Sequence, residues 1–522
     1  MRFSAFLRSP VVVLTLIGVA LMLPALLWGP GYTHSKQYNV LWTNHFGAQM
    51  AAGNLYERWL PGSFEGLGSP TFYFYPPFAY WISGGLRALG LPVQQAINAT
   101  GLLLLIGSGL AMHRWLAFRG TRPLLGAALY MAAPYHLYDI YVRGALAEEM
   151  AFLWLPLLAL AIDRLPDRRA VALLALSYAG LLISHLPVAM LSGILLIVPM
   201  LGARLVRRDA VLVPAAAAGT IAFALAAFFL LPALTLQDHV SIAMLWGPEY
   251  RPGDWSVWNA SFELFPSLAL GLILLAWPGA RRFWGLLAIL TALASVRLIP
   301  FLWDVPLLEK VQFPWRAFVI AEFATVTALV VCRPRRPLLA AAGVMLLFPY
   351  LFTGFLTAVF LRTPVDYARI ERAGPDAPEY LPRGFDVSRV RPIDHWTDLS
   401  PWRALPRGDS LEVARAGPVT LGHAAFPIWR VTHNGRPIAS SGPLIRFDAP
   451  APGTYRIERI ALWQERWGAR ISLAAALLLA LLCLPFRRIS HLSKFPSYSP
   501  SLIGGPPPQL SAAGRDMSGG DI

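Results

Sequence analysis

Apolar runs long enough to cross a lipid bilayer recur along this chain, and short arginine-rich segments separate many of them. A single buried core could not absorb so many runs, because each spanning helix alone needs about 20 predominantly apolar residues. Only 14% of the 522 residues are charged, against about a quarter in soluble proteins. The sequence therefore predicts a polytopic α-helical membrane protein.

The basic excess, a formal net charge of +15, follows this topology. It gathers on alternate short loops, at Arg114/Arg119/Arg122, Arg164/Arg168/Arg169, Arg204/Arg207/Arg208, Arg281/Arg282, Arg333/Arg335/Arg336 and Arg487/Arg488/Lys494. Cytoplasmic loops of membrane proteins carry such an excess, whereas a nucleic-acid-binding face would concentrate it on one surface. We therefore expect a multi-pass protein of the bacterial inner membrane, with both termini in the cytoplasm and no nucleic-acid partner.

The apolar runs predict about twelve transmembrane helices. The first, at 11–28, lacks a convincing cleavage site and is interpreted as a retained helix. The others lie near 96–113, 121–137, 150–163, 170–184, 187–203, 210–232, 267–279, 283–297, 317–332, 338–356 and 470–486. We assign 1–357 to one transmembrane domain.

The first outer loop, 29–95, is too long for a simple connection and contains segments of its own. Two amphipathic stretches, near 38–53 and 76–90, flank the glycine- and proline-rich segment PGSFEGLGSPTFYFYPP. Treating 76–90 as a further span would place Arg114, Arg119 and Arg122 outside, against the charge rule. We expect both stretches to lie along the membrane surface.

The region 358–468 is polar and contains no spanning run. Alternation around Asn434-Gly435 predicts a β-hairpin, and LIRFDA and TYRIERI alternate similarly. We expect a small β-rich extracytoplasmic domain here, followed by the last helix and its basic end at 469–494. The tail, 495–522, is rich in Pro, Gly and Ser and is expected to be disordered in the cytoplasm.

Several uncommon phrases occur in a recognisable order: YERWLPGSFEGLGSPTFYFYPPFAYW, YVRGALAEEMA, QFPWR and EYLP. Together they resemble the bacterial 6-pyruvoyl-tetrahydropterin-synthase-related membrane proteins, which look like distant relatives of the GT-C glycosyltransferases. The resemblance implies a GT-C-like fold and an enzyme that takes sugar from a polyprenyl-phosphate carrier on the periplasmic face. Its partners would be membrane lipid, a lipid-linked sugar and an envelope glycan or protein acceptor.

One departure from this resemblance concerns the first outer loop. GT-C enzymes usually carry an acidic residue early in that loop, and this chain has Thr33-His34-Ser35 there. Ser35 thus stands where the resemblance implies an acid. The catalytic carboxylate would then come from another segment, or the chemistry would be lost.

The phrase YDIYVRGALAEEM places Asp139, Arg143, Glu148 and Glu149 in one short outer loop. Charges at the edge of the hydrocarbon are costly unless they are paired or solvated. A carboxylate here could act as a general base or a metal ligand, and Arg143 could hold a phosphate through its planar fork. The structural alternative is an Arg–Glu ion pair at a helix end.

Arg316, in QFPWR, is the first candidate to neutralise a departing phosphate, and Arg58 is the second. The alternative for each is a snorkelling interfacial arginine. His34 and His185 are candidate proton acceptors or ligands, although a buried, hydrogen-bonded histidine is commoner. Two histidines with two carboxylates could bind a divalent cation, but no ligand spacing supports a metal site.

Two other functions fit a chain of this class. A transporter or flippase would carry ionisable residues deep within several helices, and often internal repeats, of which the sequence has none. A non-catalytic envelope scaffold would lack a polar cavity joining the first outer loop to the loop 139–149. The glycosyltransferase hypothesis requires Arg143, Glu148 and Arg316 to share one hollow.

Overall fold

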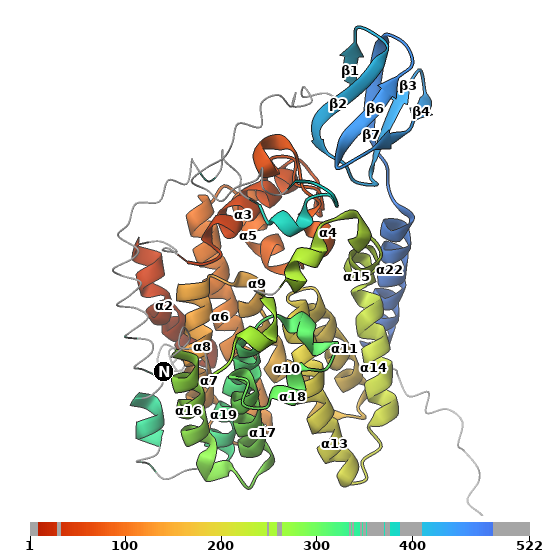
Figure 1. Ribbon diagram of the computed structural model, residues 1–522. Coiled ribbons are helices and arrows are strands. Elements are labelled where there is room, and N and C mark those ends of the chain that lie inside the picture. The colour runs from red at the N-terminus through yellow and green to blue at the C-terminus, as the bar shows by residue number, and fades with distance from the viewer. Residues whose placement is uncertain are drawn as a thin grey trace, which may run out of the picture. The chain divides into compact units, whose positions relative to one another are not determined.

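The computed structural model describes residues 9–28, 33–247, 250–257, 264–332, 339–344, 376–386 and 410–483, with isolated positions at 336, 347, 351 and 370. Residues 1–483 form one compact unit, in which a helical part continues into a small β-rich region (Figure 1). The predicted disordered tail, 495–522, lies outside the described residues.

The helical part begins with one long helix, a group of short ones and a second long helix. These are α2 (Pro10–Trp28), α3 (Lys36–Ala51), α4 (Thr71–Phe74), α5 (Phe78–Ala88) and α6 (Val93–Phe118). The two predicted amphipathic stretches thus correspond to α3 and α5, which pack against each other. The single-turn helix η1 (Ser63–Gly66) and α4 lie between them.

The central segments follow in close succession. They are α7 (Pro123–Met131), α8 (Pro134–Tyr138), the π-helical turn η2 (Asp139–Arg143), α9 (Leu146–Glu149), α10 (Ala151–Arg164), α11 (Arg168–Leu182), α12 (Leu186–Ser192), the π-helical turn η3 (Gly193–Ile197), α13 (Val198–Val206), α14 (Leu212–Leu225) and α15 (Ala227–Thr235). Segments α12 to α13 form one continuous span, and α14 meets α15 at an angle of 71°.

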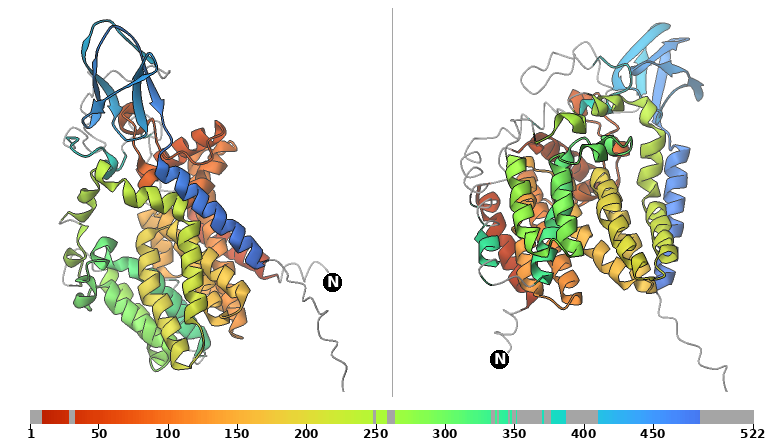
Figure 2. Two further views of the ribbon diagram at one scale, coloured as in Figure 1. Left: turned by 90° about the vertical axis from the view of Figure 1, so that its right-hand side faces the viewer. Right: turned by 60° about the horizontal axis from the view of Figure 1, so that its bottom comes forward.

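The remaining helical segments are η4 (Gln237–His239), η5 (Ile242–Trp246), η7 (Pro252–Asp254), α16 (Leu264–Ala276), η9 (Trp277–Gly279), α17 (Phe283–Ser295), α18 (Pro300–Trp303), η10 (Leu308–Val311), η11 (Pro314–Ala317), α19 (Phe318–Val331), η12 (Pro378–Tyr380) and α22 (Trp463–Cys483). Helix α19 is buried on every side from Phe318 to Val330 and forms the centre of the largest hydrophobic core. The final helix, α22, lies beside α14 and α15 (Figure 2).

Five described helices are long and apolar enough to cross a bilayer, and the bent pair α14–α15 makes a sixth if it counts as one span. Helices α16 and α17 are apolar but shorter. The predicted span 338–356 lies largely outside the described residues. The chain is therefore a mostly helical membrane protein, whereas the count of twelve spans stays a prediction.

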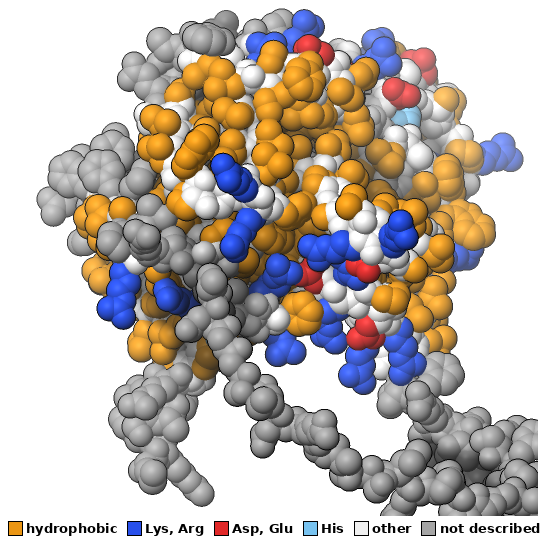
Figure 3. Space-filling view, turned by 90° about the horizontal axis from the view of Figure 1, so that it is seen from below, with side chains coloured by type: hydrophobic (Ala, Val, Ile, Leu, Met, Phe, Trp, Pro, Cys, Tyr) orange, Lys and Arg blue, Asp and Glu red, His pale blue; other side chains and the backbone are white. Residues whose placement is uncertain are grey.

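Arginine side chains occupy one end of the helical part. Figure 3 shows Lys and Arg side chains among hydrophobic ones on the face seen from below. The C-terminal ends of α6, α10 and α13 lie together, since Arg119 is 2.7 Å from Asp163 and Arg204 Nη1 donates to Ile162 O at 2.7 Å. The strands and the short helices α3 and α5 lie toward the opposite end (Figure 1).

The β-rich region consists of two antiparallel sheets. One has the order β1-β7-β3-β4 and the other β2-β6-β5, from β1 (Ser410–Val413), β2 (Gly417–Ala424), β3 (Trp429–His433), β4 (Arg436–Ile438), β5 (Ser440–Ser441), β6 (Leu444–Ala449) and β7 (Gly453–Arg459). Val431 and Ile457 of one sheet share a hydrophobic core with Ile445 and Phe447 of the other. A small β region near the C-terminal end is thus present as predicted.

The predicted hairpin is confirmed. His433 pairs with Arg436, and the two intervening residues, Asn434 and Gly435, have φ values of 50° and 74°. Positive φ at both positions is the signature of the type I′ turn, whose twist matches that of the flanking strands. LIRFDA and TYRIERI form β6 and most of β7, respectively.

Candidate functional site

A cavity of about 770 Å³ lies where the first outer loop, the loop 139–149 and the segment 377–380 meet. Pockets that hold small molecules typically measure 300–1,000 Å³. Its charged and imidazole-bearing lining residues are Arg143, Glu148, His185, Lys310, Arg316 and Glu379. Four of the sequence-predicted residues, Arg143, Glu148, His185 and Arg316, therefore share one hollow.

Arg143 is the last residue of the π-helical turn η2, and Gly144 after it adopts φ 61°, ψ 34°. Such π turns occur frequently at functional sites. The break turns the guanidinium toward three acceptors: Nη1 lies 2.7 Å from Asp139 Oδ1, 2.7 Å from the Tyr135 hydroxyl and 2.6 Å from Glu148 Oε2. Glycine is required at 144, since a Cβ there would lie 2.2 Å from Thr33 Oγ1.

Glu148 is the central anion of the group and is 1% exposed. Its Oε1 accepts a hydrogen bond of 2.8 Å from the Tyr135 hydroxyl, and its Oε2 lies 3.5 Å from Arg316 Nε. Burial acts to raise the pKa of Glu148, but the Arg143 guanidinium and the other neighbouring cations outweigh it, so the pKa lies below its usual value. Glu148 is thus a charged carboxylate held among cations.

Arg316 is positioned by an unusual turn at Gln312. That residue has φ 67° and ψ −59°, and the Phe313 N–H donates to Val311 O at 2.8 Å. These values define a classic γ-turn, which is rare and strained. Arg316 Nη1 donates to Val311 O at 2.7 Å and to Gln312 Oε1 at 3.0 Å. Both acceptors of the guanidinium thus belong to the strained turn.

His185 caps α12 and faces the same cavity. Its Nδ1 accepts a hydrogen bond of 3.2 Å from the Val188 N–H, so the neutral ring carries its proton on Nε2. Nε2 lies 3.7 Å from Glu148 Oε2. Burial, only partly opposed by Glu148, lowers the pKa of His185 to about 3. His185 is therefore a neutral donor toward the cavity, an arrangement that favours its predicted role as a ligand over that of a proton acceptor.

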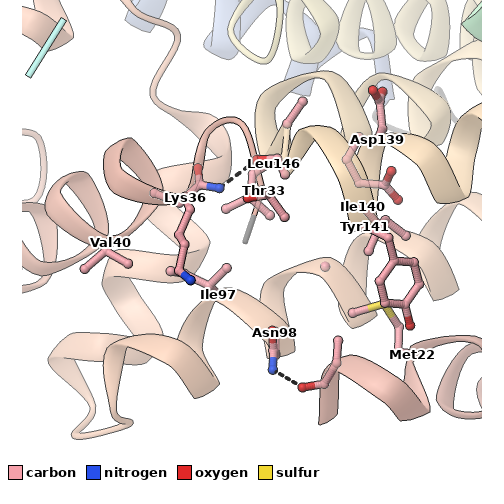
Figure 4. A pocket seen from close by; sticks show the side chains of 16 residues that line it. Met22, Thr33, Lys36, Val40, Ile97, Asn98, Asp139, Ile140, Tyr141 and Leu146 are labelled. Carbon is pink, nitrogen blue, oxygen red and sulfur yellow. Dashed lines mark hydrogen bonds between the residues drawn. The ribbon is translucent and has the colours of Figure 1, made fainter. Parts of the chain in front are cut away.

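Asp139 and Glu149 do not line this cavity. They border a smaller one of about 30 Å³, lined by Thr33 and Lys36 as well (Figure 4). Glu149 Oε1 lies 2.8 Å from His136 Nε2, and burial raises the pKa of Asp139 well above its usual value, with the Glu148 carboxylate adding to the shift. Both acids therefore lie outside the larger cavity, and a substrate bound there would not contact them.

Two other sequence-predicted residues lie elsewhere. Arg58 contacts Glu465 at 3.4 Å and the Phe228 carbonyl at 3.0 Å, and it lines neither cavity. The His34 side chain is exposed and lines neither cavity, while its backbone N–H donates to Val142 O at 3.0 Å. The proposed roles of Arg58 in phosphate binding and His34 in catalysis therefore have no support from the geometry.

Asp376 and Glu379 were not predicted from the sequence. Buried Asp376 accepts hydrogen bonds from Trp42 Nε1 at 2.7 Å, Ser63 Oγ at 2.7 Å and Thr71 Oγ1 at 2.8 Å. It thereby fixes the segment that carries Glu379 to the first outer loop. The only available signal was the phrase EYLP, which contains Glu379 but gives no indication of its surroundings.

Within the described residues, no group of three or more His, Cys, Asp or Glu side chains could hold a metal ion. The carboxylate of Glu148 is surrounded by Arg143, Arg316 and His185, which compete with any cation for it. The chemistry available in this part of the chain is thus hydrogen-bond donation and positive charge toward an anion, together with proton acceptance by a carboxylate.

Comparison with known proteins gives one family and a distant likeness to solved structures. No curated protein matches the chain. The structure of arabinofuranosyltransferase AftD from Mycobacteria is similar at 17% identity and a TM-score of 0.43, covering 68% of this chain and 27% of that one. A mutant form of AftD gives a TM-score of 0.42 and 17% identity, over 67% and 28%. The chain thus corresponds to less than a third of AftD.

The family model covers residues 72–352, more than half of the chain. This range contains Arg143, Glu148, His185 and Arg316, whereas Glu379 lies beyond it. It is described as a 6-pyruvoyl-tetrahydropterin synthase related domain of membrane proteins. Because this family model matches more than half of a chain with membrane-spanning helices, the chain is a member of the 6-pyruvoyl-tetrahydropterin-synthase-related membrane protein family.

Proposed function

We propose that this protein is a membrane glycosyltransferase that takes its sugar from a polyprenyl-phosphate carrier. One observation carries the proposal: the 770 Å³ cavity combines a group of cationic and hydrogen-bond-donating side chains with an apolar wall. A lipid-linked sugar phosphate has the matching parts, namely an anion, a hydrocarbon chain and a polar ring. The family's resemblance to GT-C enzymes points to the same reaction class.

The phosphate is assigned to Arg316, Arg143 and His185. Glu148 and Asp139 both contact Arg143, at 2.6 and 2.7 Å, whereas Arg316 meets Glu148 only at 3.5 Å. Arg316 is therefore the guanidinium better placed to meet an anion at the cavity wall. His185 Nε2–H adds a neutral donor beside it. Stabilising the charge that develops on a departing phosphate is the contribution these groups would make.

The hydrocarbon chain is assigned to the wall formed by α12 and α15. Leu186, Met190, Leu230 and Leu234 line the cavity there. Leu234 is 66% exposed, so this wall reaches the outer surface of the helical part. A polyprenyl chain could therefore remain in lipid while its phosphate lies inside the cavity.

The sugar is assigned to the aromatic side of the cavity. Trp42, Tyr75, Tyr80 and Tyr380 line it and offer ring faces. The Trp42 N–H and the Tyr80 hydroxyl donate to Asp376 and Asn39, respectively, and thereby hold two of these rings in place. The cavity lies at the end of the helices remote from the arginine-rich loops. By the positive-inside rule that end faces the periplasm, and we place the reaction there.

The competing functions fit these observations less well. A scaffold would need no polar cavity between the first outer loop and the loop 139–149, yet Ser35, Asn39, Arg143 and Glu148 line one together. A transporter would carry ionisable groups deep in several helices. Among the described spans Glu322 in α19 is such a group, and it accepts hydrogen bonds from the backbone N–H groups that begin α8.

The test uses undecaprenyl phosphate as a probe of the phosphate subsite, with the full chain in detergent. Arg316→Gln should weaken binding at least tenfold, because a charge-assisted contact to phosphate is lost. Arg58→Gln removes the same charge outside the cavity and should bind like the wild type. Equal affinity in all three proteins would refute the assignment. Release of polyprenyl phosphate from a panel of polyprenyl-phosphate sugars then tests transfer itself.

A further inference from the structure

A second carboxylate faces the cavity from a part of the chain outside the family match. Glu379 lies on the single-turn helix η12, and it lines the cavity together with Ala377, Pro378 and Tyr380. Glu148 and Glu379 are the two acidic residues in the described lining. They approach the same space from different segments, one at the cationic group and the other beside the aromatic residues.

The backbone around Glu379 is held on both sides. Before it, Asp376 is fixed by side-chain hydrogen bonds from the first outer loop. After it, Leu381 O accepts from the Ser241 N–H at 2.9 Å, and Arg383 N–H donates to His239 O at 3.1 Å. The short helix is thus clamped between the first outer loop and the chain after α15, which gives Glu379 a defined position.

The two lining acids differ in their electrostatic partners. Glu148 Oε2 has Arg143, Arg316 and His185 within 2.6–3.7 Å. No cation in the described part of the chain forms an ion pair with Glu379. A carboxylate bound to two guanidinium groups is a weak base, because protonation would break its ion pairs. The acid without such partners is the better proton acceptor.

We infer that Glu379 is the general base that activates the acceptor hydroxyl. This inference rests on the proposed transferase function. In the step, the acceptor O–H proton passes to the Glu379 carboxylate while the acceptor oxygen forms a bond to the anomeric carbon. The bond from that carbon to the phosphate oxygen breaks, and its electron pair leaves with the polyprenyl phosphate. Water later removes the proton from Glu379.

The titration behaviour of Glu379 agrees with this role. Burial raises its pKa to about 7, Asp376 adds to the increase, and its own backbone N–H opposes it. Tyr38 of α3 and Tyr380 of η12 are the other titratable groups coupled to it. A general base works best when its pKa lies near the operating pH. Turnover governed by Glu379 should therefore rise with pH through about 7 as the carboxyl loses its proton.

The experiment compares Glu379→Gln, Glu379→Asp and the wild type. The full-length proteins, in nanodiscs, receive a panel of polyprenyl-phosphate sugars with an envelope-glycan extract as acceptor. Glu379→Gln should lower turnover by about 10²–10⁴-fold and abolish the rise with pH, while undecaprenyl phosphate binds as to the wild type. Glu379→Asp should recover part of the turnover. Glu458→Gln, an exposed change in the β-rich region, is the matched control.

The outcomes separate this inference from the function on which it rests. If wild-type protein releases no polyprenyl phosphate from any donor, the transferase function fails and the base assignment falls with it. If the wild type turns over and Glu379→Gln retains its rate and pH profile, only the base assignment is overturned. Loss of probe binding in Glu379→Gln would also overturn it, because a base should leave the phosphate subsite intact.

Discussion

Two groups of acidic and basic side chains in this protein look alike in composition but differ in setting. The cavity group comprises Arg143, Glu148, His185 and Arg316. The junction group comprises Glu57, Arg58, Arg459 and Glu465, with Arg459 lying 3.5 Å from Glu57 and 3.6 Å from Glu465. It links the first outer loop to the end of β7 and the start of α22 and lines neither described cavity.

The difference lies in the balance of charge. The junction group has two carboxylates for two guanidinium groups, and Tyr73 adds a hydrogen bond of 2.8 Å to Glu465. Each charge there is satisfied by another part of the chain. At the cavity wall two guanidinium groups surround Glu148, and Asp139, which also contacts Arg143, lies outside the lining. Arg316 meets Glu148 only at 3.5 Å and lies beside the open space of the cavity. We therefore interpret the first as structural and the second as a site for an anion.

The strongest challenge to this comparison is Arg143→Ala. Removing it would leave Glu148 buried with weakened compensation, and breaking a buried ion pair typically costs about 3–5 kcal/mol. The free energy of unfolding in mixed micelles should fall by about this amount. Arg459→Ala, at a side chain 39% exposed, should cost about 1 kcal/mol or less. Equal losses would mean that the two groups are both structural.

A second substitution, Glu148→Gln, is expected to increase the affinity for phosphate rather than to lower it. Glu148→Gln removes the anion that competes with a bound phosphate for Arg143 and Arg316. Undecaprenyl phosphate should then bind severalfold more tightly, up to about tenfold, a change of about 1.4 kcal/mol. Titration of the probe against the detergent-solubilised protein measures it. Weaker binding in a folded variant would show that Glu148 contacts the ligand or orients the arginines.

The smallest expected effect concerns the junction group. A double-mutant cycle of Arg58→Gln and Glu465→Gln should give a coupling of about 1 kcal/mol in unfolding free energy, since the pair is separated by 3.4 Å and each side chain keeps another partner, Phe228 O for Arg58 and Arg459 for Glu465. Binding of undecaprenyl phosphate should stay at the wild-type level in both single variants. A tenfold loss of affinity for undecaprenyl phosphate in either variant would show that Arg58 or Glu465 belongs to the anion site.

The sequence predicted the cavity group better than the rest of the site. Arg143 and Glu148 lie only five positions apart, and charges at a membrane interface need partners, so their proximity could be inferred. The convergence of Arg316 with them was expected from the family resemblance. The orientation of Asp139 and Glu149 could not be predicted, because the π-helical turn η2 shifts the register that would otherwise place neighbouring side chains.

Glu379 and Asp376 could not be predicted from the sequence for another reason. Both lie in the polar region 358–468, before the segments whose alternation predicts strands, and the side chains that hold Asp376 are more than 300 positions away in the chain. Long-range hydrogen bonds of this kind leave no periodic signal. The β-hairpin at Asn434-Gly435, by contrast, is encoded locally by its turn residues and was predicted correctly.

The γ-turn at Gln312 lowers the stability of the fold while it orients the Arg316 guanidinium. A backbone held in so sparsely populated a conformation costs about 1–3 kcal/mol, and glycine at this position would relieve much of that cost. Glycine would also delete the amide that receives the Arg316 guanidinium and donates to Leu245 O at 3.2 Å. A laboratory search for heat-tolerant variants would thus tend to accept glycine here, at the expense of the arginine's orientation.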